Sequence, residues 1–410
     1  MSLGLLHGLA GLAAPNKLVA LTVDHGLRAG SADEARRVKA HCRRLGICHE
    51  TLVWEAEPPK AGLQAAARRA RYRLLGSAAA RLGLAAVLTA HTSDDQDETL
   101  EMRRSRSPSE SAPGLAGISR ATLFDGRLWV LRPLLDVTRA EIRAHLAHAG
   151  VDWIEDPSNR DLRFERVRVR AQLKDRPAAH GGQDSEAIAG ARSRLAESAA
   201  AFIGARCRAG EDETIRMRCS PGDDAEVVAA VIAALIDLCG GAAQPLDRRG
   251  KATLAALAKD CIKGPDTSHR AVTLGRALLR HRGRDLLIRR ESRGLETLDV
   301  APGAVADWDG RYRVQNLDAK ARLTVSAGGC DGVSPSFGRD LHPETVWSNT
   351  QQVIGGFRSR RLLGRSSAIL PVCELPLAQS LARLVQTGGP PPCPWDTPKG
   401  ELASAKADVL

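Results

Sequence analysis

Four polar side chains at helical spacing mark the segment LTAHTSDDQDETLEMRR, which runs from Leu88 to Arg104. They fall at positions i, i+3, i+4 and i+7, so a continuous helix would align them in one stripe: His91, Asp94, Asp95 and Glu98. Such a stripe could hold Mg²⁺, with Asp94 and Asp95 as ligands, or could anchor an amine. The alternative is that the acids only complement the positive end of the helix dipole.

A second group of polar residues follows an apolar strand pattern in LVALTVDHGLR, from Leu18 to Arg28. Asp24 and His25 come directly after the apolar run, and Gly26 follows them. Ligands of open α/β sheets bind at the carboxyl ends of strands, so these side chains are candidates for ligand binding. An ordinary Asp-Gly turn is the alternative.

Arginines form two further candidate groups. In LQAAARRARYRLL, Arg68 and Arg71 are spaced for adjacent faces of a helix, although such a helix can equally be a solvated one. In WIEDPSNRDLRFERVRVR the arginines alternate with valine, at Arg166, Arg168 and Arg170. If this segment is extended, three guanidinium groups point the same way, which suits phosphates. An exposed edge strand protected by its arginines is the alternative.

The elements that must position these residues follow from the hydrophobic patterning. The first 170 residues alternate short apolar runs with helical patterns, which predicts an α/β fold with a doubly wound, mostly parallel sheet. The expected helices cover 3–14, 32–45, 63–82, 94–104 and 138–149, and the expected strands cover 18–23, 48–54, 86–90 and 128–131. The pattern begins on a helix, whereas folds of this class normally open with a strand.

A polar segment broken by Pro and Gly, residues 174–185, predicts a domain boundary. Helical patterns at 187–208, 224–239 and 247–261 predict a helical domain over 185–263. From 264 to 410 we expect a mixed α+β region, with strands at 271–274, 285–290 and 311–314 and a flexible Pro-rich tail from 388 to 400.

Composition narrows the function classes. The 410 residues suggest two or three domains, and the formal net charge of +11 favours a polyanionic partner such as nucleic acid. Only 3% of the residues are aromatic, which argues against a base-stacking platform. The longest apolar run, Val227 to Ile236, is about half of what a membrane span needs. Nine cysteines without a C-x-x-C pair indicate neither a disulfide framework nor a spaced zinc site, and we expect a cytoplasmic protein.

Taken together and in this order, the four motifs resemble the bacterial tRNA(Ile)-lysidine synthetase family, a branch of the PP-loop ATP pyrophosphatases. The likeness covers about residues 2–170, and it includes GLAGIS at 114–119 and RPLLDVTRAEI at 132–142. A weaker likeness continues to about residue 316. The resemblance implies a PP-loop domain over 1–173 and a tRNA-binding role for the helical domain at 185–263.

The resemblance implies a two-step reaction on the wobble cytidine of a tRNA(Ile) with a CAU anticodon. ATP, with Mg²⁺, adenylates O2 of the base, and the ε-amine of free L-lysine then attacks C2 and expels AMP. The catalytic residues would be His91, Asp94, Asp95, Glu98 and Arg68, with Asp94 and Asp95 as metal ligands. Ser2, Asp24, His25 and Arg71 would bind the nucleotide, and Asn159, Arg166, Arg168 and Arg170 the tRNA. No membrane is expected, and a homodimer is left open.

One departure from the family pattern concerns its phosphate-binding loop, SGGxDS, of which only Ser2 aligns with the final residue. We therefore expect the reading frame to extend upstream, and we expect the chain as it stands to be poorly stable and inactive. Two other functions stay open. One is another PP-loop tRNA-modifying enzyme such as a thiolase, which the missing C-x-x-C pair disfavours. The other is a noncatalytic remnant that binds tRNA.

Overall fold

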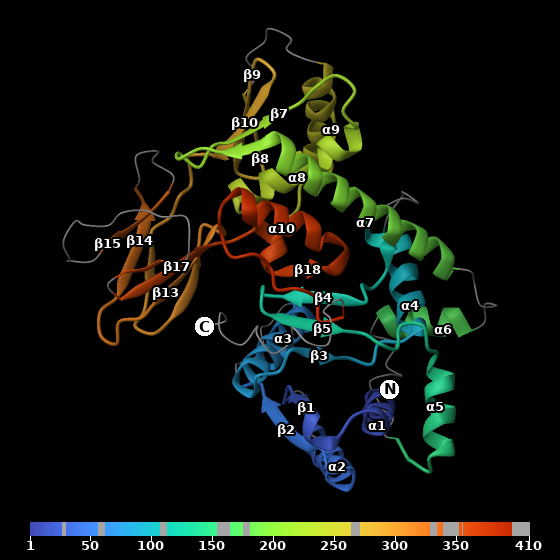
Figure 1. Ribbon diagram of the computed structural model, residues 1–410. Helices are drawn as coiled ribbons and strands as arrows, with labels where there is room; N and C mark the ends of the chain where they lie inside the picture. Colours follow the sequence, from blue (N-terminus) through green and yellow to red (C-terminus); the bar gives the residue numbers. More distant parts are fainter. Residues whose placement is uncertain are drawn as a thin grey trace. The chain divides into compact units, whose positions relative to one another are not determined.

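The computed structural model in Figure 1 describes most of the chain. The described residues are 1–26, 30–55, 62–106, 113–153, 165–174, 181–263, 271–328, 334–338, 352–354 and 356–395. The chain divides into two compact units, one formed by Met1–Gly190 with Pro392–Leu410 and the other by Ala191–Pro391.

The first unit contains two small sheets. Strands β1 (Val19–Asp24) and β2 (Cys48–Val53) pair in parallel, and β3 (Ala86–Leu88) pairs in parallel with β5 (Leu128–Leu131). A strand that the patterning did not predict, β4 (Ala121–Phe124), forms an antiparallel hairpin with β5. All eight residues of this hairpin's strands are buried, so neither strand shows the alternation that marks a half-exposed strand. The predicted α/β class with mostly parallel strands is confirmed.

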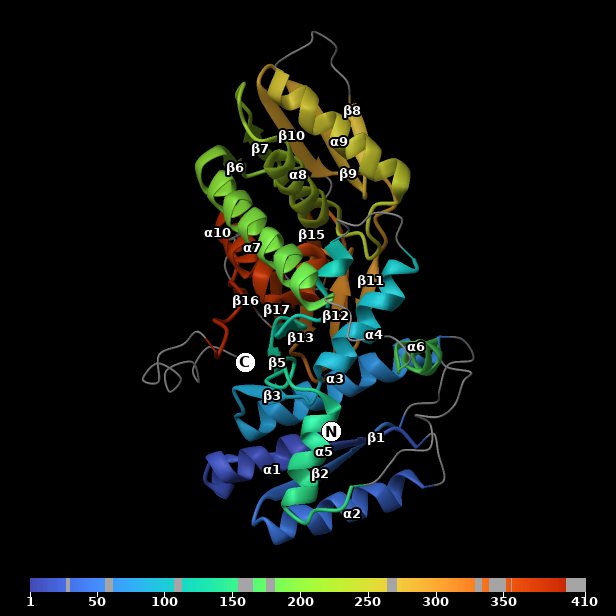
Figure 2. The same ribbon diagram turned by 90° about the vertical axis from the view of Figure 1, so that its right-hand side faces the viewer.

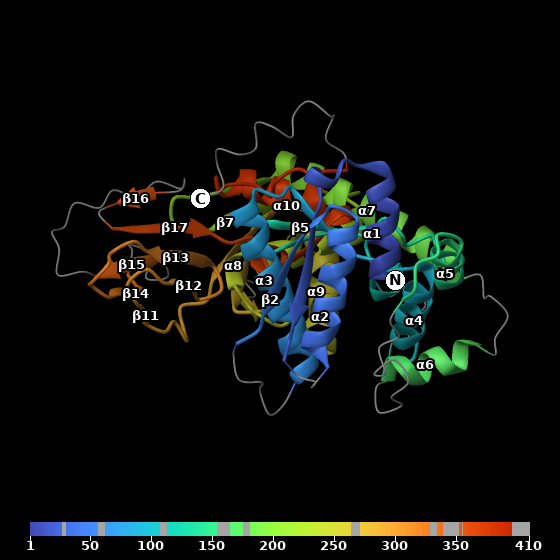
Figure 3. The same ribbon diagram turned by 90° about the horizontal axis from the view of Figure 1, so that it is seen from below.

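All five helices predicted before residue 150 are present, and a sixth follows. They are α1 (Ser2–Leu12), α2 (Ser31–Arg44), α3 (Leu63–Leu82), α4 (Ser93–Arg104), α5 (Arg139–His148) and α6 (Glu165–Lys174). Helix α2 packs against β1 and β2 (Figure 3). Helix α3 joins the two sheets, because its Tyr72, Leu75 and Ala79 share one hydrophobic cluster with Val130 of β5 and Val23 of β1. Through this cluster, α3 holds β1 and β3 in place against the same side of the helix.

The second unit begins with a five-stranded antiparallel sheet and its helices. The helices are α7 (Gly181–Arg206), α8 (Ala225–Gly240) and α9 (Arg248–Lys263). The strands, in spatial order, are β6 (Cys207–Ala209), β7 (Ile215–Arg218), β10 (Asp285–Arg290), β9 (Ala277–Arg282) and β8 (Ala271–Leu274). The three helices match the prediction. Residues 185–263 are nevertheless not a separate helical domain. Strands β6 and β7 lie between α7 and α8 in the sequence, and they pair into the same sheet as the strands after residue 270.

Two further antiparallel sheets follow in this unit, as the predicted mixed α+β region requires. One contains β11 (Leu298–Val300), β14 (Leu323–Ala327) and β15 (Pro335–Gly338); the other contains β12 (Val305–Trp308), β13 (Tyr312–Asn316), β17 (Phe357–Arg361) and β16 (Gln352–Ile354). They share one core around Val300, Trp308 and Val325. Strand β18 (Ile369–Pro371) and helix α10 (Leu375–Leu384) come last.

Part of the expected flexible tail has a defined position. Residues 388–395 are described, and Cys393 among them is buried, while the rest of the tail lies outside the described residues. Across the described ranges, no helix is long and apolar enough to cross a membrane.

Candidate functional site

The carboxyl end of β1 carries the first polar cluster of the first unit. Oδ1 of Asp24 accepts a hydrogen bond of 2.9 Å from the backbone N–H of Gly26, whose φ of +64° is a conformation that favours glycine. This bond and a further one from Ser31 lower the pKa of Asp24. Arg71 of α3 approaches the neighbouring His25, with 3.3 Å between Nη2 and Nε2. The structure thus brings together three of the predicted nucleotide-binding residues, Asp24, His25 and Arg71.

Trp54, which the sequence did not single out, completes this cluster. Its ring lies edge-on to that of His25, with centroids 5.7 Å apart. Burial, and then the charge of Arg71, lower the pKa of His25, so its imidazole is neutral at pH 7. Nδ1 of His25 and Nε1 of Trp54 are buried and have no hydrogen-bond partner within the described structure. Because unmatched buried polar atoms are costly, the pair suits a polar, planar ligand.

His91 lies between β3 and α4, as the predicted bounds of the strand and the helix require. Helix α4 begins at Ser93, and Thr92 caps it through a capping box in which Oδ2 of Asp95 accepts from the backbone N–H (2.8 Å) and Oγ1 (2.8 Å) of Thr92. His91 therefore precedes the helix, so the stripe that a continuous helix would form contains only the three acids, Asp94, Asp95 and Glu98. Nδ1 of His91 lies 2.9 Å from Oγ1 of Thr89, the residue that follows the last residue of β3.

Three arginines act electrostatically on His91, Arg132 most strongly, and Asp95 offsets part of their effect. Arg132 is only 2% exposed; its Nη1 donates to Ser119 O (2.7 Å) and Thr122 Oγ1 (3.0 Å), and its Nε has no partner within the described residues. Burial first, and then Arg132 and more weakly Arg68, lower the pKa of His91 to about 4. A neutral imidazole beside a buried guanidinium that has only Tyr72 and neutral oxygens as partners within the described residues is suited to an anion such as a phosphate.

The guanidinium of Arg68 lies over the ring of Tyr72, 5.0 Å from its centroid. Its charge acts on both His91 and Arg132, whereas Arg71, one turn further along α3, contacts His25. The two predicted arginines of α3 therefore serve two different clusters, one at the end of β1 and one beyond the end of β3.

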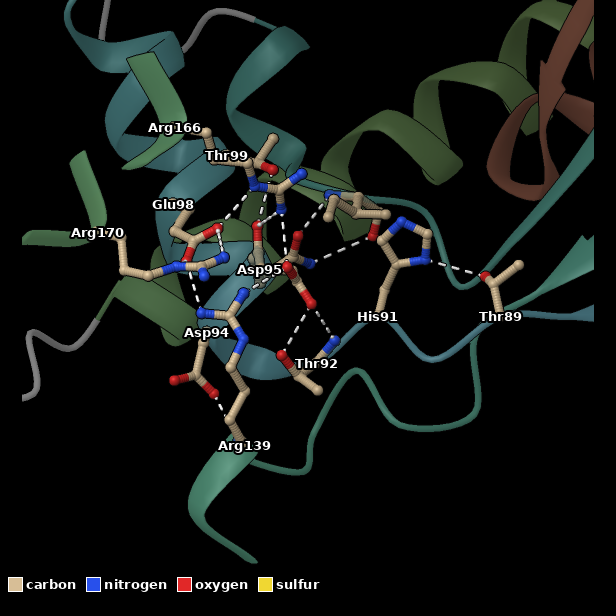
Figure 4. Close-up of polar contacts among 12 residues, drawn as sticks. Thr89, His91, Thr92, Asp94, Asp95, Glu98, Thr99, Arg139, Arg166 and Arg170 are labelled. Atoms are coloured by element: carbon tan, nitrogen blue, oxygen red, sulfur yellow. Dashed lines mark hydrogen bonds and ion pairs between the residues drawn. The ribbon is translucent and has the colours of Figure 1, made fainter. Parts of the chain in front are cut away.

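The acidic side chains of α4 are bound by arginines (Figure 4). Glu98, 1% exposed, accepts from Arg139 Nη1 (2.6 Å), Arg166 Nε (2.6 Å) and Arg170 Nε (2.7 Å). Oδ1 of Asp95 accepts from Arg139 Nη2 (2.6 Å) and Arg166 Nη2 (2.9 Å). Burial acts to raise the pKa of both carboxyl groups, but the arginines outweigh it and hold both pKa values below the ordinary range.

The prediction of an extended, phosphate-facing arginine row was wrong. The segment is the helix α6, in which Arg166 and Arg170, four residues apart, lie on one face and turn toward Glu98 of α4 (Figure 4). Arg168 lies off that face, because two residues correspond to about 200° of helical rotation. The Val-Arg alternation matched a strand, whereas burial of Glu98 and its need for cationic partners favour the helix.

These contacts leave little room for a metal ion on the predicted ligands. Both oxygens of Asp95 are already occupied by Thr92 and two arginines, and Oδ2 of Asp94 accepts from the backbone N–H of Arg139 (2.7 Å). Over the residues with a described position, no three His, Cys, Asp or Glu side chains come together as a metal site. The side chains present do not fit a preformed Mg²⁺ centre at Asp94 and Asp95.

Two predicted residues remain. Ser2 is the first residue of α1, and the pKa of the adjacent Met1 amino group is lowered by burial and then by Arg143 and Arg139, which places this end of α1 near the arginine cluster. Asn159 lies outside the described residues. Sequence reasoning did not single out Arg139, although it stands in the RPLLDVTRAEI motif. It also missed Thr89 and Arg132, although both stand in quoted motifs, and Trp54, for which no motif gave a signal.

Comparisons with known proteins identify the family of the chain. Residues 2–176 match the family of PP-loop domains. Three curated proteins called tRNA(Ile)-lysidine synthase are similar to this chain. The protein of Mesorhizobium japonicum is 39% identical, and the match covers 76% of this chain and 68% of that protein. For the protein of Rhizobium meliloti the identity is 38%, with 80% of this chain and 74% of that protein covered, and for that of Brucella anthropi it is 37%, with 77% of this chain and 72% of that protein covered. A solved U34-tRNA thiolase from Methanococcus maripaludis aligns at a TM-score of only 0.34 and 12% identity, covering 43% of this chain and 62% of its own.

Proposed function

The chain belongs to the tRNA(Ile)-lysidine synthase family, and we propose that it ligates lysine to the wobble cytidine of a tRNA(Ile) with a CAU anticodon, at the expense of ATP. In the first step, O2 of the base attacks the α-phosphorus and pyrophosphate leaves. In the second, the ε-amine of lysine attacks C2 and loses a proton, and the C2–O2 bond breaks so that AMP leaves with O2. The proposal rests on the family membership.

The observation that supports this chemistry is the buried guanidinium of Arg132, whose Nε has no partner within the described residues, beside the neutral His91 just past the end of β3. We assign the transferred phosphate to Arg68, His91 and Arg132, because a neutral imidazole and a guanidinium without an acidic partner both favour an anion. His91 is neutral at pH 7 and can accept a hydrogen bond or donate one, but its pKa of about 4 makes it a weak base.

We assign the nucleoside of ATP to the cluster at the end of β1. The unmatched Nδ1 of His25 and Nε1 of Trp54 can pair with polar atoms of a base, and Arg71 and Asp24 flank them. Ser2, at the start of α1, is proposed to lie toward the phosphates. Mg²⁺ is proposed to arrive on the triphosphate, since Asp94 and Asp95 do not fit a preformed metal site.

We assign the lysine ammonium to the carboxylates of α4. Asp94 is the most available of them, because its Oδ1 has no partner within the described structure, while Glu98 is bound by arginines and Asp95 by arginines and Thr92. Arg166 and Arg170 then act by holding these carboxylates. Arg168, on another face of α6, keeps the proposed role toward tRNA together with Asn159.

The test is incorporation of labelled lysine into a tRNA(Ile) transcript with a CAU anticodon, and a transcript with a UAU anticodon is the control. Both the 410-residue chain and the product of the longest in-frame reading frame are assayed. We expect incorporation that requires ATP, is absent with the control transcript and is abolished by Asp94→Ala. Asp97→Ala is the matched control, since Asp97 is an exposed carboxylate on the same helix. If both products bind the tRNA but neither incorporates lysine, the chain is a noncatalytic binder and the proposal fails.

A further inference from the structure

The five-stranded sheet of the second unit has one face covered by helices. The residues on this face are buried, among them Ile215, Met217, Leu279, Leu286 and Ile288. His281 on the same face contacts α9, with 3.8 Å between its Nε2 and Sγ of Cys261. Figure 2 shows α9 running across β8, β9 and β10, and α8 also packs against β9 and β10. Packing against the helices therefore accounts for the buried residues at every second position of these strands.

The opposite face of the same sheet carries arginines. Because side chains alternate along a strand, the residues between the buried ones point away from the helices. On β6, β7, β9 and β10 these positions include six exposed arginines, namely Arg208, Arg216, Arg218, Arg280, Arg282 and Arg289. The other members are small or apolar, apart from Thr273 and one acid, Asp285.

The strand register arranges these arginines in rows across the sheet. Arg208 stands directly opposite Arg216, and that row continues through Leu287 to Arg280. The next row runs from Arg218 through Asp285 to Arg282. Nη1 of Arg208 turns back to the end of α7, where it donates to the backbone oxygens of Gly204 (3.1 Å) and Cys207 (2.7 Å), so Arg208 is held within the fold and the other five arginines carry the charge of this face.

The face is also short of negative charge. Asp285 is shared by Arg218, at 2.8 Å, and Arg216, at 3.8 Å. Glu291 follows the end of β10 and is bound by Arg293 and Thr273. Within the described part of the chain, Arg280, Arg282 and Arg289 have no acidic partner. This leaves an open sheet face with a large excess of positive charge.

We propose that this open sheet face binds the sugar–phosphate backbone of the tRNA, an inference that rests on the proposed function because it takes tRNA as the substrate. Arginine binds phosphates through its planar set of N–H donors. The face carries no aromatic side chain on which a base could stack, so it contacts the backbone and not the bases. A second copy of the same face would be repelled by its charge.

The experiment compares two triple variants of equal charge change in the full chain. The first is Arg280→Gln/Arg282→Gln/Arg289→Gln, on the open face. The control is Arg248→Gln/Arg249→Gln/Lys251→Gln, three exposed cations of α9 on the other side of the sheet. Filter binding of the tRNA transcript over a range of salt concentrations gives the Kd of each protein and its salt dependence.

We expect the open-face variant to bind roughly tenfold to a hundredfold more weakly near 0.15 M salt, with a salt slope reduced by about one per arginine in contact. The control should bind like the unmodified chain. Circular dichroism checks that both variants fold; if the triple variant does not, the single change Arg289→Gln is expected to lower the slope by about one.

Each other result overturns the inference. Unchanged binding by the open-face variant, with tight binding by the unmodified chain, rejects the face but leaves the proposed function standing. Absence of tRNA binding by the unmodified chain rejects both. If the variant keeps tRNA binding but loses binding to phosphatidylserine vesicles, the face is a lipid-binding surface instead.

Discussion

Arg139 binds Glu98 across 41 residues of sequence, with 2.6 Å between Nη1 and Oε1. The same guanidinium holds Asp95, so the first turn of α5 is tied to the first two turns of α4. Glu98 is buried and accepts from two further arginines of α6. One carboxylate thus joins three helices, which makes it the most informative position in the first unit to change.

Glu98→Gln is expected to destabilise the first unit by about 3 kcal/mol or more, because removing one partner of a buried ion pair leaves the other charge uncompensated. Urea unfolding of the full chain measures the change. The control is Glu50→Gln, which removes a surface ion pair with Arg81 and should cost less than about 1 kcal/mol. Equal losses in the free energy of unfolding for the two substitutions would show that the buried ion pairs of Glu98 contribute no more to stability than a surface ion pair.

Lowering the pH should remove the stabilisation that the ionised carboxylates of Asp95 and Glu98 provide. The pKa values of Asp95 and Glu98 are lowered in the folded chain. A carboxyl group of this kind stabilises the fold above its unfolded pKa, near 4, and loses that contribution as the pH falls through its folded pKa. We expect the stability difference between the unmodified chain and Glu98→Gln to be large at pH 7 and to shrink steadily below about pH 4. A difference independent of pH would contradict the lowered pKa.

Arg132→Gln should raise the pKa of His91 from about 4 by part of its shift, because it removes the charge that lowers this pKa most, while burial, the main cause, remains. The pKa is read from the pH dependence of the His91 imidazole signals by NMR, assigned by comparison with His91→Gln. The control is Arg120→Gln, whose exposed partner is Asp136. Should Arg132→Gln unfold the chain, Arg68→Gln tests the same repulsion and is expected to give a smaller rise.

Trp54→Phe should weaken ATP binding several-fold while leaving the ring contact with His25 in place, because phenylalanine keeps an aromatic face but lacks the N–H donor. Calorimetric titration with ATP measures the affinity. Trp395→Phe, at an exposed position, is the matched control and should bind like the unmodified chain. Unchanged affinity for Trp54→Phe would remove Trp54 from the nucleotide site.

Asp309 plays a comparable part in the second unit. It accepts from Arg290 Nε (2.9 Å), Arg311 Nε (2.6 Å) and Arg276, and the first two arginines are almost fully buried. Its φ of +55° is one that Asn also tolerates, so Asp309→Asn changes the charge without straining the backbone. We expect a loss of about 3–5 kcal/mol in urea unfolding. Asp307→Asn, which affects the more exposed pair with Arg313, is the control and should have a much smaller effect.

The sequence by itself determined the elements that depend on neighbouring residues. Helix α3 has the predicted bounds, and Thr92 with Asp95 caps α4 through bonds within three residues of chain. The strand ends that carry Asp24 and His91 also followed from local apolar runs. Such features are predictable because their energies come from contacts along a short stretch of chain.

Only the tertiary structure decided how distant residues combine. The alternation of Val167 and Val169 with arginine fits a strand as well as a helix, and Glu98, about 70 residues away, selects the helix by binding Arg166 and Arg170. The pairing of β7 with β10 likewise places Arg218 opposite Asp285, 67 residues further along the chain. Local patterns carry no information on such pairs, because their energy arises only when folding buries one charge beside another or fixes a strand register.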